Sequence, residues 1–141
     1  MTRSPRTGPA PAPPFVAAWL AVCVVAVVYV TLYPWTGWHL PGVPLFAFLS
    51  EPWPRYWTRL DLWLNVAAYL PLGLLGTAWL SRWLRLSVAA LVAALLATLL
   101  SCGLEALQTL LPQRVSSLPD MLSNTAGVST YSTFSARPVR N

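Results

Sequence analysis

The sequence predicts an all-α, polytopic membrane protein with three full transmembrane helices and a short or truncated fourth helix. Of its 141 residues, 56% are hydrophobic and only 9% are charged, and the mean hydropathy is +0.56. This composition is far from that of a soluble globular domain. Apolar runs of about 20 residues, long enough to cross the hydrocarbon core of a bilayer, occur three times along the chain.

The first expected element is a disordered basic tail over residues 1–14, where prolines and two arginines stand without an apolar run. Three transmembrane helices follow in order. A signal peptide is the alternative for the first, but Tyr33 and Pro34 follow it in place of a small-residue cleavage site. The predicted spans are residues 15–33, 60–80 and 86–111.

The predicted connections carry interfacial residues. Residues 34–59 combine several prolines with tryptophans, which block a continuous helix and favour the headgroup level. Within them, residues 45–49 form an apolar stretch that we expect to dip into the interface, and His39 takes an interfacial polar role. A second loop over residues 112–119 holds Arg114 and has a proline at each end.

The expected fourth helix covers residues 120–127, with Asp120 at its positive end. Residues 129–141 are rich in serine, threonine and arginine, so we do not expect them to continue the helix as a full span. The sequence therefore predicts a transmembrane domain over residues 15–128 and a polar tail over 129–141. A truncated or frameshifted reading frame would explain that tail.

Arginine placement favours a cytoplasmic amino terminus. All nine basic residues are arginines, and they lie singly or in pairs between apolar runs, which is typical of topology signals and not of nucleic-acid binding. With three crossings, the cytoplasmic arginines would be Arg3, Arg6, Arg82 and Arg85, and the outward ones Arg55, Arg59 and Arg114. A fourth crossing would add Arg137 and Arg140 to the cytoplasmic side.

Polar residues recur at helical spacing within the apolar segments. A carboxylate in a span costs about 2.5 to 3.5 kcal/mol, so it normally faces a cavity or a partner. Residues three or four positions apart share one helix face. Arg114 is the expected countercharge of Glu105. On each helix these polar residues therefore form a stripe along one face. Such stripes predict one polar pocket near the outer surface; the alternative is that the polar side chains join the helices by hydrogen bonds. The candidate pocket residues are Asp61, Asn65, Tyr69, Glu105, Gln108, Arg114, Asp120 and Asn124.

Metal and cofactor chemistry is not expected. Cys23 and Cys102 lie inside apolar stretches, where a thiol behaves as a small hydrophobe, and no second candidate ligand accompanies His39. We therefore predict no metal site and no cofactor.

Several short motifs resemble those of the VanZ-like family when taken in order. They are Tyr33-Pro34-Trp35-Thr36-Gly37-Trp38, Asp61 and Asn65 with Tyr69-Leu70-Pro71-Leu72-Gly73, Glu105-Ala106-Leu107-Gln108 leading to Pro112-Gln113-Arg114, and Asp120 with Asn124-Thr125-Ala126-Gly127. The resemblance implies a bacterial integral membrane protein of the cell envelope, from a group associated with low-level resistance to the glycopeptide teicoplanin. It implies no mechanism. The family usually continues with an apolar helix where this chain turns polar after Gly127.

The sequence favours a non-catalytic envelope protein that binds a lipid-linked or cell-wall-related ligand, with Arg114 engaging an anionic group. One alternative is an intramembrane enzyme acting on a lipid head group, with Glu105 and Asp120 as general acid and base. Another is a small proton-linked transporter that uses the carboxylates as relays. Gly73, Gly76 and Ala78 form a small-residue surface suited to intrachain packing or to self-association.

Overall fold

The computed structural model describes residues 15–53 and 58–135, with side chains described as far as residue 130. The predicted tail over residues 1–14, together with Arg55, Arg137 and Arg140, lies outside the described residues. Within these ranges the chain forms α-helices and one short 3-10 helix, and no strand. The elements are α1 (Phe15–Leu32), η1 (Ala47–Leu49), α2 (Arg59–Leu80), α3 (Leu86–Gln108) and α4 (Leu118–Ser135).

Three helices, α1, α2 and α3, are long and apolar enough to cross a membrane, which confirms the predicted number of full spans. Their unpacked surfaces are apolar. On α3, for example, Leu91, Leu95 and Leu99 recur every four residues and are each more than half exposed. A continuous exposed ridge of leucines would be an aggregation hazard in water, whereas hydrocarbon chains solvate it.

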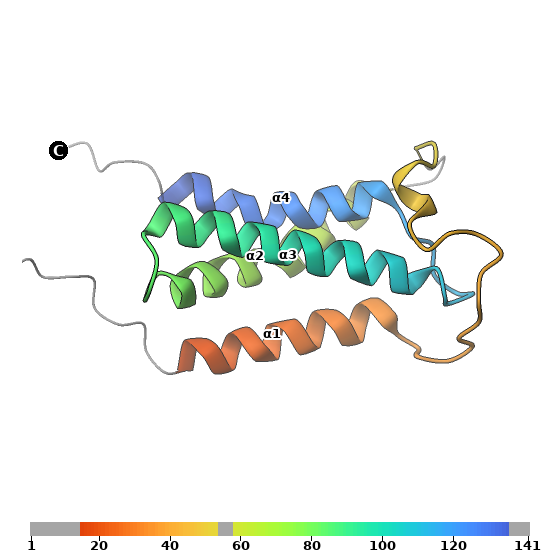
Figure 1. Cartoon of the computed structure of the whole chain (residues 1–141), viewed down its shortest axis with the longest axis horizontal. Coiled ribbons are helices and arrows are strands. Elements are labelled where there is room, and N and C mark those ends of the chain that lie inside the picture. The colour runs from red at the N-terminus through yellow and green to blue at the C-terminus, as the bar shows by residue number, and fades with distance from the viewer. Residues whose placement is uncertain (1–14, 54–57, 136–141) are drawn as a thin grey trace, which may run out of the picture.

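The helices run up and down, so that alternate ends meet (Figure 1). α4 packs against α2 and α3, and α1 packs against α2 and α3 on the other side of the bundle. The carboxyl ends of α1 and α3 and the amino ends of α2 and α4 therefore lie at one end of the molecule, beside the loop that contains η1. The positive ends of two helix dipoles and the negative ends of two others are brought together there.

α4 is longer than predicted. It continues past Gly127 to Ser135, through residues expected to belong to the polar tail, although it is not among the helices apolar enough to cross a membrane. Its hydroxyl side chains donate back to backbone carbonyls four residues earlier. These bonds join Thr125 to Met121, Ser129 to Thr125 and Thr130 to Ala126, at 2.9, 2.8 and 2.7 Å. Such bonds satisfy the hydroxyls locally, so a Ser/Thr-rich composition does not end the helix.

Two glycines allow α2 and α4 to cross at backbone contact. A Cβ added at Gly73 would lie 2.7 Å from the carbonyl oxygen of Val128, and one at Gly127 would collide with the carbonyl of Val66. Gly76 lies beside Ala93 on α3, where an added Cβ would make an ordinary contact at 3.4 Å. The small-residue surface of α2 therefore serves packing within the chain, as one of the two predicted uses. Self-association remains a prediction.

The loop between α1 and α2 is attached to the bundle at defined points. The His39 backbone N–H donates to the Leu110 carbonyl at 3.0 Å, and Trp35 donates through its ring nitrogen to the Tyr29 carbonyl of α1 at 3.1 Å. Gly37, with φ of 80°, lies against the Pro112 ring. In the segment 45–49, Phe48 is 2% exposed and anchors η1 to the protein. The loop therefore covers the end of the bundle where the four helix ends meet.

We predict that Gly127→Ala separates α2 from α4, because the new methyl group meets backbone atoms of Val66 that cannot rotate away. The free energy of unfolding should fall by about 1 to 3 kcal/mol, as in overpacked cores. Thermal unfolding in detergent micelles, followed by far-ultraviolet circular dichroism, measures the effect. Gly103→Ala is the matched control, since nothing lies within 4 Å of a Cβ there. Equal melting temperatures for the two variants would contradict the close crossing.

Candidate functional site

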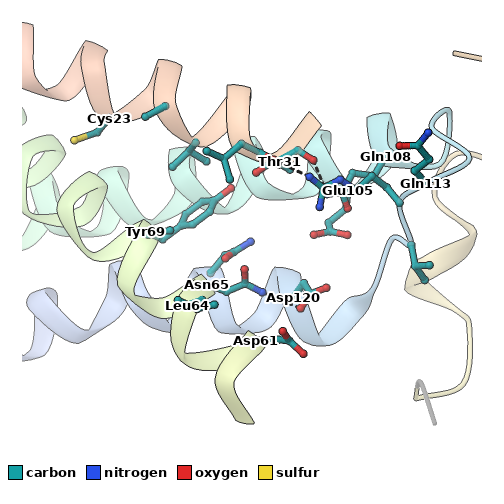
Figure 2. Close-up of a pocket in the computed structure, with 17 residues that line it drawn as sticks. Cys23, Thr31, Asp61, Leu64, Asn65, Tyr69, Glu105, Gln108, Gln113 and Asp120 are labelled. Carbon is teal, nitrogen blue, oxygen red and sulfur yellow. Dashed lines mark hydrogen bonds between the residues drawn. The ribbon is translucent and has the colours of Figure 1, made fainter. Parts of the chain in front are cut away.

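All eight candidate pocket residues line one cavity of about 710 Å³ at the loop end of the bundle (Figure 2). α1 forms one wall, and α2, α3, α4 and the loop before α4 form the rest. Among the described residues, no three His, Cys, Asp or Glu side chains are grouped so that they could hold a metal ion. The further lining residues are Cys23, Ala26, Val27, Val30, Thr31, Leu64, Ala68, Gln113 and Val115.

The two sides of the cavity differ in polarity. The α1 side presents Ala26, Val27 and Val30, whereas the opposite side presents three carboxylates, from α2, α3 and α4. In Figure 2, Asp61, Asp120 and Glu105 lie around a common space whose far side is α1. The cavity is therefore amphipathic across its width.

The amino terminus of α4 organises the polar side. Glu105, which is 3% exposed, accepts a 2.9 Å hydrogen bond through Oε2 from the Ser117 backbone N–H. The Ser117 hydroxyl donates to Asp120 Oδ2 at 2.6 Å and accepts from the Asp120 backbone N–H at 3.2 Å. Unpaired N–H groups and the helix dipole make a helix amino terminus favourable for negative charge. One carboxylate from α3 and one from α4 are thus held at the same helix end.

α2 contributes the next two groups. The Asn65 side-chain NH₂ donates to Asp120 Oδ1 at 2.8 Å, which joins α2 to α4. Asp61 is exposed and closes a capping box with Thr58, whose backbone N–H and hydroxyl both donate to Asp61 Oδ2, at 3.0 and 2.6 Å. A cap of this kind sets where α2 begins and keeps the Asp61 carboxylate at the cavity edge.

Deeper between α3 and α4, Asn124 donates through Nδ2 to the Ser101 hydroxyl at 2.9 Å. The Tyr69 phenol interacts with the same hydroxyl and is 3% exposed. Asn124 is 6% exposed, and its Oδ1 atom is enclosed without a hydrogen-bond partner among the described residues. A buried acceptor left unpaired costs about 1 to 3 kcal/mol, so a donor that reached this oxygen would recover that cost.

The carboxyl end of α1 is held by side chains from the other wall. Gln108 donates through Nε2 to the Thr31 carbonyl at 3.0 Å. Arg114 donates through Nε to the Tyr33 carbonyl at 2.8 Å and through Nη2 to the Val30 carbonyl at 2.9 Å. Such bonds satisfy carbonyls that have no partner at a helix end.

The expectation that Arg114 is the countercharge of Glu105 is therefore wrong. The carbonyls at the end of α1 present fixed acceptors that match the fork of the guanidinium. Glu105 instead takes its hydrogen bond from the backbone of Ser117. The two ionisable side chains line the same cavity, but each is committed to a different helix end.

The cavity residues also join helices, as the alternative interpretation predicts. Asn65 with Asp120, Asn124 with Ser101, and Gln108 with Thr31 are each a hydrogen bond between two helices. Both interpretations of the polar stripes thus describe the same residues. Packing uses the amide NH₂ groups and the Asp120 carboxylate, whereas Glu105 and Asp61 each keep one carboxylate oxygen without a hydrogen bond to another described residue.

Sequence reasoning missed two serines that organise the site. Ser101 precedes Glu105 by four residues, so it extends the polar stripe of α3 by one turn, and that spacing could have identified it. Ser117 precedes Asp120 by three residues, which is the signature of a helix N-cap. Thr31 and Gln113 also line the cavity, but they stand among apolar or loop residues with no pattern to single them out.

A protein-family model described as VanZ/LLP1 matches residues 17–134. The chain belongs to the VanZ/LLP1 family. The match includes all eight cavity residues and reaches nearly to the end of α4, so the VanZ/LLP1 region extends beyond Gly127. Neither a curated protein nor a solved structure matches this VanZ/LLP1 chain. The assignment therefore supplies a family and a membrane location, without a ligand.

We predict that Arg114→Gln loosens the carboxyl end of α1 in this VanZ/LLP1 protein, because two charge-assisted bonds to backbone carbonyls are lost. The free energy of unfolding should fall by about 1 to 2 kcal/mol, since the guanidinium is partly exposed. Amide hydrogen exchange should rise at residues 28–33 and remain unchanged in α4. Arg82→Gln, at an exposed arginine outside the cavity, is the control. Unchanged exchange in Arg114→Gln would show that the fork does not hold α1.

Proposed function

We propose that this membrane protein binds the head group of an amphipathic, membrane-embedded molecule, of the lipid-linked or cell-wall-related class, without transforming it. The observation that carries the proposal is the amphipathic cavity of about 710 Å³ that all eight candidate residues line. Pockets for small molecules commonly measure about 300 to 1,000 Å³ and combine an apolar wall with a few convergent polar groups. The cavity has that size and that composition.

The amphipathic walls suit a ligand that is itself amphipathic. The alanine and valine side chains of α1 can cover the first part of an acyl or prenyl chain, while the head group meets Glu105, Asp120 and Asn65. Polar side chains at this depth are expensive unless a partner or water solvates them. A ligand with polar groups would recover that cost. If packing were the only role of these positions, neutral Asn and Ser side chains that pair with each other would hold the helices together without the cost of placing carboxylates there.

A binding role accounts for the hydroxyl chemistry better than an enzymatic one. The Ser117 hydroxyl contacts the Asp120 carboxylate: it donates to Asp120 Oδ2 and accepts from the Asp120 backbone N–H. A nucleophilic serine needs a base that takes its proton while the oxygen stays open to the substrate. Here the oxygen caps α4, so the contact explains helix stability without catalysis.

We further propose that the cavity opens toward the outside of a bacterial cell membrane, with the amino terminus in the cytoplasm. Arg82 and Arg85 lie at the opposite end of the bundle, in the short turn between α2 and α3, where the positive-inside rule favours the cytoplasm. Arg82 also stacks on Trp83, 5.3 Å from the ring centroid, as is common at a membrane interface.

The orientation predicts which positions a membrane-impermeant maleimide labels in intact cells. In a background without Cys23 and Cys102, His39→Cys should react, because His39 is exposed in the loop at the cavity end. Arg82→Cys should react only after the cells are permeabilised. The reverse pattern would place the cavity on the cytoplasmic side.

We predict that Ala68→Phe blocks ligand binding and that Ala67→Phe does not. The two alanines are neighbours on α2 and both are exposed, but only Ala68 lines the cavity. Native mass spectrometry of the purified chain with total bacterial membrane lipid measures the bound amphiphile. Ala68→Phe should reduce occupancy about tenfold, the equivalent of 1.4 kcal/mol. Equal occupancy in both variants would reject the cavity as the binding site.

The same pair of variants tests the association with teicoplanin resistance that the family resemblance implies. In teicoplanin-susceptible bacteria, expression of the unaltered chain or of Ala67→Phe should raise the inhibitory concentration of the antibiotic, and Ala68→Phe should not. If all three chains leave susceptibility unchanged while lipid binding persists, the resistance role fails and the binding role stands.

A further inference from the structure

We infer that the head group taken by this cavity carries a primary ammonium, a cation with several N–H donors. The inference rests on the proposed function and specifies the ligand chemistry of that site. It comes from an inventory of the hydrogen-bond donors and acceptors at the cavity, in which the side-chain amide donors of the helices are already used and several carboxylate and amide oxygens are not.

The side-chain amide donors on the helices are engaged within the protein, and the donors left over include those of Gln113 and part of the Arg114 guanidinium. The side-chain NH₂ groups of Asn65, Gln108 and Asn124 donate to Asp120, to the Thr31 carbonyl and to Ser101. Arg114 has two of its nitrogens on the carbonyls at the end of α1. The carboxylate and the carbonyl can only accept, so the amides of Asn65 and Gln108 must place their NH₂ groups there and leave their oxygens on the other side.

The acceptors remain available. Glu105 uses only Oε2 and Asp61 only Oδ2 in hydrogen bonds with other described residues, which leaves one carboxylate oxygen of each at the cavity. The amide oxygens of Asn65 and Gln108 accept no hydrogen bond within the described part of the chain. Carboxylate and amide oxygens require donors, and a ligand that supplies only acceptors would leave them unpaired.

Asn124 supplies an independent observation. It lines the cavity and is 94% buried, and its Oδ1 atom has no partner among the residues that the structure describes. Buried acceptors in proteins are nearly always paired, so an orphan at a cavity indicates a missing donor. Because this oxygen is enclosed, a ligand donor reaches it only when the Asn124 amide turns toward the cavity; an ammonium can then supply one N–H there while it bonds a carboxylate with another.

Charge favours a cation over a neutral hydroxyl group. Asp61, Glu105 and Asp120 line the cavity against a single guanidinium, that of Arg114. In a region where lipid lowers the dielectric constant, this excess of acidic groups attracts cations and repels phosphate or carboxylate ligands. The anionic ligand expected from Arg114 alone is therefore the disfavoured class.

Dodecyl amphiphiles that differ only in the head group test the inference directly. The probes are dodecylammonium, dodecyltrimethylammonium, dodecyl glucoside and dodecyl phosphate, titrated into the full chain in a polyoxyethylene detergent and measured by native mass spectrometry. We expect dodecylammonium to bind at least about tenfold more tightly than each of the others. The trimethyl probe keeps the charge but has no N–H donor, and the glucoside keeps donors without the charge.

Bilayer nanodiscs identify the source of the ammonium. Enrichment of phosphatidylethanolamine over phosphatidylcholine and phosphatidylglycerol would support the inference and assign the ammonium to a phospholipid. Tight binding of dodecylammonium without that enrichment would also support it, and would assign the ammonium to an amphiphile of another class.

Charge variants at the cavity edge avoid any effect on folding. Gln113 is exposed, lines the cavity and makes no hydrogen bond with another described residue. Gln113→Lys should weaken dodecylammonium binding about threefold and Gln113→Glu should strengthen it by a similar factor, as expected for exposed charges. Glu51→Gln, at an exposed acid that does not line this cavity, should have no effect.

The failure of this inference is distinguishable from the failure of the proposed function. If dodecyl phosphate or dodecyl glucoside binds more tightly than dodecylammonium, the cavity binds amphiphiles but the ammonium assignment is overturned. If none of the probes binds and Ala68→Phe has no effect on bound lipid, both fail. If dodecyltrimethylammonium binds as tightly as dodecylammonium, charge alone decides and the N–H requirement is wrong.

Discussion

The contact between Glu105 and the amino terminus of α4 is the interaction on which the rest of the structure depends. α4 is too polar to be counted with the membrane-spanning helices, yet it packs along α2 and α3. Its first N–H groups need acceptors in a place where water is scarce. Glu105, from α3, accepts from the Ser117 N–H, and the Ser117 hydroxyl accepts from the Asp120 N–H. These bonds fix where α4 starts and therefore where two acidic groups lie.

The crossing of α2 and α4 at Gly73 and Gly127 complements this contact. Because the two backbones touch, no large side chain separates the helices, and Asn65 can reach Asp120 at 2.8 Å. In lipid there is little hydrophobic drive for helix association, so close packing and buried hydrogen bonds must hold the bundle together. The same features that assemble α2, α3 and α4 thereby gather their carboxylates and amides at one end.

The cavity exists because α1 is held differently from the other helices. It has no glycine contact with the bundle, and its hydrogen bonds to the rest of the site are made at its carboxyl end, by Gln108 and Arg114. These bonds fix that end beside the polar groups without closing the space between them. An apolar helix opposite a polar wall is the result, and the proposed binding of amphipathic molecules rests on this pairing.

The sequence by itself determined the membrane class, the three spans and the polar stripes, because these depend on composition and on helical periodicity, which are local properties. The seven residues that the stripes singled out line the cavity, as does Arg114, which was predicted from its place near Glu105. The same local reasoning predicted that α4 ends near Gly127, whereas the helix continues to Ser135. Side-chain hydrogen bonds, such as that from Thr130 to the Ala126 carbonyl, let this polar segment remain helical. Only the tertiary structure decided that Arg114 binds the carbonyls of α1 and that Ser117 receives Glu105. Those partners lie far apart in the chain or on other helices, and hydrogen-bond geometry in three dimensions chooses among them.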